Sequence, residues 1–278
     1  MSVGVFLAVL FAAFLHAGWN ALVKLGLSKL TSIVILTLLQ GGAGLAIALT
    51  RDWPAPEVWP WLIASGVFHA AYKLFLAFAY EQGDLSRVYP IARGAAPLVV
   101  AVLSLVFLSD LLTPAELLGI VVLGTGIVAM ARGVFSGGES TRLLPFALGS
   151  ALMTAGYSIV DGLGARVSGD AVMYVGWLFA LDAALLVPLC LALRGRDVLR
   201  ADARSWGLGA LAAGASYGAY AIAVWAMTLA PIALVAALRE SSILFAVLIG
   251  WLAFGERLDR QKALAAGLIV TGLVLTRL

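Results

Sequence analysis

Ten apolar segments of this chain are each close to the roughly 20 residues that a helix needs to cross the hydrocarbon core of a bilayer. Charged residues make up only 12% of the 278 residues and hydrophobic residues 63%, whereas a soluble domain carries about 25% charged residues. These proportions predict an all-α, polytopic membrane protein with almost no room for a soluble domain. The predicted membrane helices cover residues 3–25, 30–49, 59–80, 85–108, 114–131, 143–163, 171–193, 206–229, 232–254 and 262–278.

The charge balance and the scarce residue types disfavour several other classes of protein. The net charge of +3 is small, and no basic run with interleaved aromatic residues predicts binding to nucleic acid. The two histidines do not stand in a metal-ligating spacing such as His-Glu-x-x-His, and no nucleophile elbow is evident, so an intramembrane enzyme is disfavoured. We therefore expect no metal ion, and as partners only the lipid bilayer and a small-molecule substrate.

Two arginines inside predicted membrane helices relate the first half of the chain to the second. Arg93 and Arg239 lie 146 residues apart, and each is followed 17 residues later by a carboxylate, Asp110 or Glu256. A guanidinium held in lipid costs about 2.5–3.5 kcal/mol even on the lenient insertion scale, so such an arginine ordinarily faces a polar cavity or a partner. The repeated pair predicts two related halves that each place a cation at membrane depth.

A second match supports the repeat and extends it to the start of each half. Residues 17–20 (AGWN) correspond to residues 155–158 (AGYS) at an offset of 138. The predicted repeats are residues 1–135 and 143–278, with five helices each; because five is odd, the second repeat would enter the membrane from the opposite side. This five-plus-five inverted repeat is typical of secondary transporters, which hold their substrate between the repeats. Chance similarity between apolar sequences is the alternative.

Glycines in the predicted helices indicate where helices approach one another closely, because small residues let membrane helices come into backbone contact. The glycines expected to act in this way are Gly41, Gly42, Gly44, Gly119, Gly124, Gly126, Gly267 and Gly272.

Three stretches of the sequence resemble the EamA branch of the drug/metabolite transporter superfamily. They are residues 16–24 (HAGWNALVK), residues 83–97 (GDLSRVYPIARGAAP), and residues 238–240 (LRE) followed by 255–257 (GER). The resemblance covers nearly the whole chain as two repeats. It implies ten helices, no cofactor and the export of small metabolites, among which aromatic amino acids are the best-known type. His69, Tyr72 and Tyr89 resemble the polar and aromatic cavity of the aromatic amino acid exporters in particular.

The first predicted helix carries a polar stripe, in which His16, Trp19, Asn20 and Lys24 stand three or four residues apart and so share one face. A polar stripe on a membrane helix points away from lipid, which makes Trp19 a candidate substrate contact and His16 a candidate for proton coupling. Hydrogen bonds that only join helices are an equal alternative for His16 and Asn20. Lys24 lies near the helix end and can reach the interface.

The third predicted helix offers the strongest candidates for substrate contact, because His69, Tyr72 and Lys73 lie on one side of it. Lys73 lies too deep for its ammonium to reach water easily, so it needs either a carboxylate or a wet cavity. Histidine is the one side chain that ordinarily changes charge near neutral pH. His69 is therefore a candidate proton-sensitive group, with a merely hydrogen-bonded histidine as the alternative.

Charged and aromatic residues on later helices complete the expected site. Asp161 and Glu240 could neutralise Lys73 or Arg93 in the empty protein or contact the substrate, and both are candidates for proton coupling. A zwitterion with an apolar side chain suits this set, since its carboxylate would pair with arginine or lysine and its ammonium with a carboxylate. The predicted substrate-binding residues are Trp19, His69, Tyr72, Lys73, Tyr89, Arg93, Tyr157, Tyr217, Arg239 and Glu240.

Two transporter functions stay open. The first is an exporter of amino acids, aromatic ones included, or of similar small metabolites, which works by alternating access around a central cavity. We expect it to be a multi-pass protein of the bacterial inner membrane and a monomer with internal pseudo-twofold symmetry. The alternative is a proton-coupled exporter of drugs or organic cations, in which the Asp161 and Glu240 carboxylates dominate.

The orientation of the chain in the membrane is open as well. The loops on the side of the termini carry three Lys or Arg residues and the opposite loops eleven, so the positive-inside rule places both termini outside the cell. The family resemblance implies the reverse, with both termini in the cytoplasm.

Overall fold

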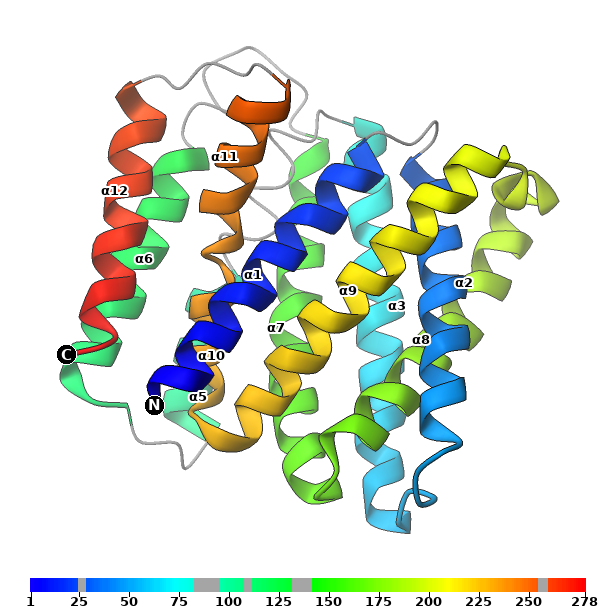
Figure 1. Ribbon diagram of the computed structural model, residues 1–278, viewed down its shortest axis with the longest axis horizontal. Helices are drawn as coiled ribbons and strands as arrows, with labels where there is room; N and C mark the ends of the chain where they lie inside the picture. Colours follow the sequence, from blue (N-terminus) through cyan, green and yellow to red (C-terminus); the bar gives the residue numbers. More distant parts are fainter. Residues whose placement is uncertain (25–28, 83–95, 108–111, 132–141, 255–259) are drawn as a thin grey trace.

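The computed structural model describes the chain apart from residues 25–28, 83–95, 108–111, 132–141 and 255–259 (Figure 1). The described residues form helices and no strand, which confirms the prediction of an all-α protein. The helices are α1 (Val3–Lys24), α2 (Lys29–Ala48), α3 (Trp59–Gln82), α5 (Ala96–Phe107), α6 (Pro114–Ala131), α7 (Leu143–Ser168), α8 (Ala171–Arg194), α9 (Ala203–Leu229), α10 (Ile232–Arg239), α11 (Ser242–Phe254) and α12 (Arg260–Leu275). Two short 3₁₀ helices, Pro56–Val58 and Arg196–Leu199, precede α3 and α9.

Membrane-spanning length and apolarity are found in seven of the described segments, which supports a multi-pass membrane protein. A shorter apolar helix, Pro114–Ala129, accompanies them. The predicted total of ten membrane helices stays a prediction, since most of predicted helix 85–108 lies outside the described residues. The seven segments are Val3–Val23, Leu30–Ala48, Pro56–Ala79, Leu143–Ser168, Ala171–Arg194, Ala203–Leu229 and Ile232–Ala253.

Capping residues explain two helix ends that the apolar pattern misplaced. The α7 helix continues beyond residue 163 to Ser168, where Gly169 takes the left-handed conformation (φ 67°) that ends many helices. The α9 helix begins at Ala203 rather than at residue 206, because the Asp202 carboxylate accepts a hydrogen bond from Ser205 N at 2.9 Å. Such a cap satisfies one of the free amide groups in the first turn of a helix.

The predicted membrane helix 232–254 is found as one candidate span, Ile232–Ala253, but the chain breaks within it into α10 and α11 at Glu240 and Ser241. At this point the backbone bonds tighten from four residues to three, with Glu240 N donating to Ala237 O and Ser241 N to Leu238 O. The Ser241 hydroxyl also donates to Leu238 O at 2.7 Å, in competition with the helical backbone bond. Discontinuous membrane helices of this kind border the substrate sites of many secondary transporters.

The helices pack in a pattern that is nearly unchanged when the two halves are exchanged. The second helices of the two halves, α2 and α8, pack on each other, and so do the last helices, α6 and α12. The contact of α3 with α7 corresponds to the contact of α9 with α1. Arg166 near the end of α7 donates to Met227 O and Ala230 O at the end of α9. The end of α1, at Leu22, instead lines a small pocket with Ser205 near the start of α9. Corresponding helices α1 and α7 are therefore antiparallel (Figure 1).

Glycines allow the helices to come into backbone contact at two of these symmetric interfaces. A Cβ on Gly44 would lie 2.8 Å from Gly176 O in the α2–α8 pair, and one on Gly119 would lie 2.8 Å from Gly272 O in the α6–α12 pair. Gly41 and Gly126 are similarly close to backbone atoms of the facing helix, and Gly124 faces the Leu98 side chain. The same expectation was wrong for Gly42 and Gly267, where a Cβ would meet nothing within 4 Å.

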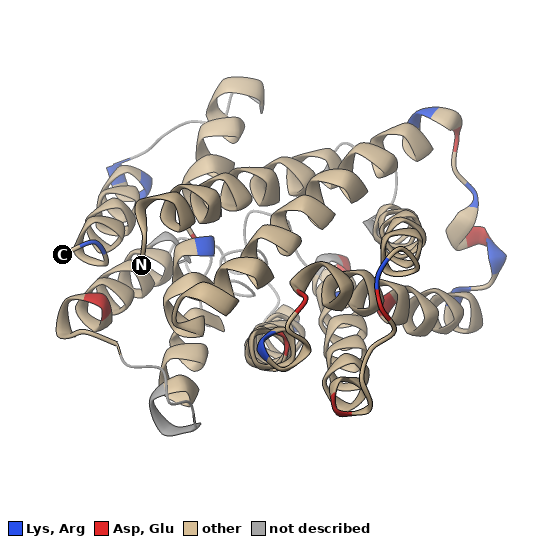
Figure 2. Ribbon diagram, turned by 60° about the horizontal axis from the view of Figure 1, so that its bottom comes forward, with Lys and Arg blue, Asp and Glu red and all other residues tan. Residues whose placement is uncertain are grey.

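Charged residues are concentrated near the ends of the helices, and most of each helix carries none (Figure 2). The connection between α8 and α9 holds several of them, including the exposed pair Arg200 and Asp197. The two termini meet at one end of the bundle, where Arg277 Nη1 donates to Met1 O at 2.8 Å (Figure 1). The few charges buried along the helices are thus exceptions, and they surround the site described next.

Candidate functional site

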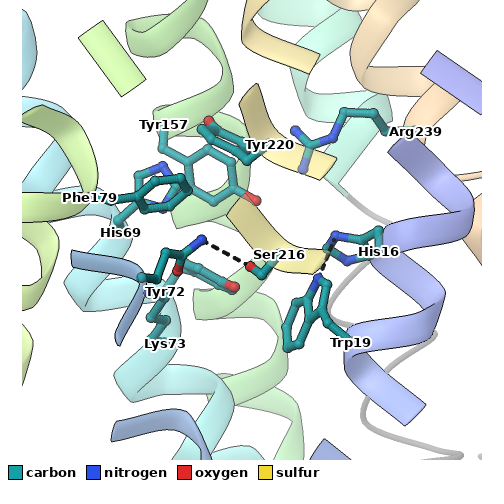
Figure 3. A pocket seen from close by; sticks show the side chains of 11 residues that line it. His16, Trp19, His69, Tyr72, Lys73, Tyr157, Phe179, Ser216, Tyr220 and Arg239 are labelled. Atoms are coloured by element: carbon teal, nitrogen blue, oxygen red, sulfur yellow. Dashed lines mark hydrogen bonds between the residues drawn. The ribbon is translucent and has the colours of Figure 1, made fainter. Parts of the chain in front are cut away.

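A small cavity lies among helices of both halves (Figure 3). Water-sized spheres can be centred over about 20 Å³ of it, which is room for about one water molecule. Small-molecule sites usually measure about 300–1,000 Å³, so this conformation is too contracted to hold a metabolite. The lining residues are His16 and Trp19 from α1, Gln40 from α2, His69, Tyr72 and Lys73 from α3, Tyr157 from α7, Phe179 from α8, Ser216 and Tyr220 from α9, and Arg239 from α10.

The Asp161 carboxylate lies behind one wall of the cavity and is fully buried. The Tyr174 hydroxyl donates to its Oδ1 at 3.2 Å, and the Tyr220 hydroxyl donates to its Oδ2. His69 Nε2 lies 2.9 Å from the same Oδ2. Hydrogen bonds of this kind are what a buried carboxylate requires. Neutralisation of Lys73, one of the roles left open for Asp161, is therefore ruled out for this arrangement, because the partners of Asp161 are one histidine and two tyrosines.

The partner of Lys73 is Asp182 on α8, a residue that the sequence analysis did not select. The Lys73 ammonium forms a buried ion pair with Asp182 Oδ2 and also donates to Thr37 Oγ1 at 2.9 Å. Asp182 stands in the middle of the apolar stretch 171–193, and a carboxylate at that depth was a signal equal to that of Asp161. The pair leaves the cavity wall at Lys73 without net charge.

Arg239 is the cation of the cavity that no carboxylate among the described residues neutralises directly. Its side chain ends over the ring of Tyr220, with Cζ 4.9 Å from the ring centroid, and the residue is only 5% exposed. Within the described part of the chain, no Asp or Glu lies within ion-pair distance of it. The neighbouring Glu240 is buried but is not part of the cavity lining. A cation held against an aromatic face on a cavity wall is suited to an anionic group of a ligand.

Aromatic rings cover the rest of the wall around His69. Its ring stacks on Tyr157 with centroids 4.1 Å apart, and Tyr220 meets it edge-on at 5.0 Å. Tyr72 and Phe179 lie edge-on at about 6 Å. The structure therefore offers an apolar ligand several faces on which to stack.

The polar residues of α1 lie on the side of the cavity opposite the rings around His69. Trp19 Nε1 donates to His16 Nδ1 at 3.2 Å (Figure 3). Since an indole nitrogen can only donate, Nδ1 of His16 carries no proton in this arrangement. Asn20 donates to His16 O within the same helix at 2.8 Å, so this bond does not join two helices.

The predicted site residues are thus divided into three groups. The structure brings Trp19, His69, Tyr72, Lys73, Tyr157 and Arg239 together at the cavity, with His16 beside them. Glu240 and Tyr217 do not line it, and the Tyr217 ring instead packs on Phe179 with centroids 5.3 Å apart. Tyr89, Arg93, Asp110 and Glu256 lie outside the described residues, as does the side chain of Lys24.

A bundle of apolar helices that gathers buried charges and rings around a central cavity has the architecture of a small-molecule transporter of the membrane. The comparison with known families defines this class further: the chain belongs to the EamA-like transporter family, whose model matches it twice, at residues 2–132 and 142–278. The predicted resemblance to the EamA type is thereby confirmed. The protein is accordingly a multi-pass membrane transporter of small molecules.

A solved structure described only as a crystal structure of a protein shares the fold. It superimposes with a TM-score of 0.76 and 22% sequence identity, over 100% of this chain and 99% of the other. No protein with a curated description matches the chain.

Proposed function

We propose that this protein is a secondary transporter for small metabolites that combine a carboxylate with an apolar or aromatic body, amino acids among them. The observation that carries the proposal is Arg239, a buried cation without a carboxylate partner among the described residues, on a wall otherwise formed by rings. Leaving a guanidinium unpaired at membrane depth is costly. A bound carboxylate would remove that cost through charge-assisted hydrogen bonds.

The neutralised state of the other charges supports the same choice. Lys73 is already paired with Asp182, and Asp161 already accepts from Tyr174 and Tyr220 with His69 beside it. Within the described lining, only Arg239 is left to attract a charged substrate, and it attracts an anion.

Transport by this site requires the cavity to enlarge and to open alternately to each side of the membrane. The antiparallel arrangement of α1 and α7, and the break between α10 and α11 next to Arg239, are the features that favour alternating access. We propose export from the cytoplasm across a bacterial inner membrane as the direction and location.

A proton-coupled exporter of organic cations is the second candidate, and the Asp161 cluster is the observation that favours it. Asp161 is a fully buried carboxylate in contact with His69, a histidine that lines the cavity. Protonation of this pair would change the charge beside a bound substrate. A cation exporter would depend on Asp161 and tolerate loss of Arg239.

Counterflow in proteoliposomes tests the proposal, with radiolabelled amino acids and aromatic acids as substrates and Arg239→Ala as the variant. The matched control is Arg194→Ala, which removes an exposed arginine from its pair with Glu81 at the end of the bundle. A charge-assisted hydrogen bond contributes about 1.5–3 kcal/mol, so we expect Arg239→Ala to lower uptake at least tenfold. Full uptake of carboxylate substrates by Arg239→Ala would refute the proposal.

A further inference from the structure

Gln40 places an unsatisfied acceptor at the cavity. This residue of α2 is 1% exposed and lines the cavity together with Ser216 of α9. Its Nε2 donates to Ser216 Oγ at 3.1 Å, whereas its Oε1 is buried and has no hydrogen-bond partner in the described part of the chain. Nearly all buried polar atoms in proteins are hydrogen-bonded, so this oxygen calls for a partner that the described residues do not supply.

The charged groups at the cavity other than Arg239 are already paired within the described part of the chain. Lys73 is bound to Asp182 and Thr37, and the Asp161 carboxylate receives hydrogen bonds from tyrosines behind the wall. A substrate whose carboxylate lies on Arg239 therefore finds no unpaired carboxylate among the described lining residues for a second, donating group. Among the described lining residues, the Gln40 oxygen is the buried acceptor that no hydrogen bond satisfies.

We propose that Gln40, oriented by Ser216, is a specificity-determining residue that accepts a hydrogen bond from an ammonium or hydroxyl group next to the carboxylate of the substrate. This inference rests on the proposed function, because it takes Arg239 as the site of the carboxylate. A plain carboxylic acid fills the same aromatic space but leaves the Gln40 oxygen unpaired. Sites built to bind a donor reject analogues that lack it for this reason.

A pair of ligands that differ only in the donor tests the role of Gln40. Titration calorimetry on the purified protein would compare L-phenylalanine with 3-phenylpropanoate in the wild type, Gln40→Leu and Gln40→Glu. We expect Gln40→Leu to weaken binding of phenylalanine about tenfold to a hundredfold, the effect of one hydrogen bond to a charged group. Binding of 3-phenylpropanoate should stay within about twofold, which also shows that the variant is folded.

The Gln40→Glu and Ser216→Ala variants keep the test decisive. Glutamate retains the acceptor, which the Ser216 hydroxyl can still reach, so this variant should keep or increase the preference for phenylalanine. Ser216→Ala leaves the amide in place but frees its orientation, so the preference should fall part of the way.

Three outcomes would count against the inference. Equal weakening of both ligands by Gln40→Leu, or an unchanged ratio between them, would overturn the role of Gln40 and leave the role of Arg239 intact. Loss of the preference in Gln40→Glu would show that the amide donates instead of accepting, and would overturn it too. Binding of neither ligand by the wild type would instead refute the proposed function, and this inference with it.

Discussion

The α6–α12 interface predicts opposite effects for two glycine substitutions in the same helix. A Cβ on Gly272 would lie 2.6 Å from Leu123 N and 2.7 Å from Gly119 O, both backbone atoms of α6. Ordinary contact begins at 3.4 Å, so in Gly272→Ala the helices must separate by up to 0.8 Å. Gly267, one and a half turns earlier in α12, would place an added methyl group with nothing within 4 Å of it and serves as the matched control.

The expected difference follows from these contacts. Overpacking costs about 1–3 kcal/mol, and the value here should be near the upper limit because backbone atoms cannot rotate aside. Alanine regains about 1 kcal/mol of helix propensity, which leaves a net loss of about 2 kcal/mol for Gly272→Ala. Gly267→Ala makes no clash and keeps the full gain, so the two variants should differ in stability by roughly 3 kcal/mol.

Thermal unfolding in one detergent, followed by tryptophan fluorescence, measures this difference. We expect Gly267→Ala to unfold at or above the temperature of the wild type and Gly272→Ala clearly below it. The α2–α8 interface supplies an independent pair: Gly41→Ala would place a Cβ 2.9 Å from Phe179 O, whereas Gly42→Ala meets nothing within 4 Å. If Gly272→Ala and Gly41→Ala were as stable as their controls, the close packing described for both interfaces would be refuted.

Three further predictions concern charged residues and orientation. Lys73→Met or Asp182→Leu alone should destabilise the protein by about 3–5 kcal/mol in thermal unfolding, because each leaves one buried charge unpaired. The double variant should recover most of this loss, since neither charge is left unpaired. Additive losses would show that the two residues do not act as a pair. Hydrogen bonds from Ser205 lower the pKa of Asp202 at the start of α9. The Asp202 carboxylate therefore stabilises the fold at neutral pH, and this stabilisation is lost as the pH falls from the ordinary pKa of 3.8 through the lower pKa of the folded state. The acid-induced drop in unfolding temperature should be smaller in Asp202→Asn than in the wild type, and an equal drop would contradict this. With Cys190 replaced by serine, the thiol of Ser136→Cys should react with a membrane-impermeant thiol reagent only from the cytoplasm if the charge bias sets the orientation. Labelling only from outside would favour the orientation that the family resemblance implies.

Helix positions were largely readable from the sequence, because an apolar run of bilayer length has few other solutions. The bounds of α6, residues 114–131, agree with the prediction to the residue. The break after Arg239 was not readable, since residues 239–242 contain no glycine or proline to mark it. It depends on the Ser241 hydroxyl and on tightened backbone bonds at Glu240, which periodicity does not detect.

The sequence predicted many residues of the candidate site but not which of them form pairs. A histidine, lysine or arginine in an apolar helix must face inward; this rule selected His69, Lys73 and Arg239, and all three line the cavity. Which helix supplies each partner depends on how α3 packs against both α7 and α8, so the sequence did not name Asp182 among the possible partners of Lys73. Gln40 was missed because an uncharged side chain gives a weaker signal in a membrane helix.

The cavity lies where the two repeats meet, and its lining is less symmetric than the helices that carry it. Trp19 and Tyr157 occupy corresponding positions of the repeats, and both line the cavity. Each half likewise contributes one helix to the interface between α2 and α8 and one helix to the interface between α6 and α12. A carrier that exchanges the conformations of its halves needs such a symmetric frame, but a small metabolite has no twofold symmetry of its own. The site must therefore break the symmetry, and it does so at His69 and the Lys73–Asp182 pair, because α9, the counterpart of α3, carries no histidine or lysine. Substitutions of His69 and Lys73 should consequently change which substrates are bound, whereas substitutions in the shared helix interfaces should alter stability and transport rate for all substrates alike.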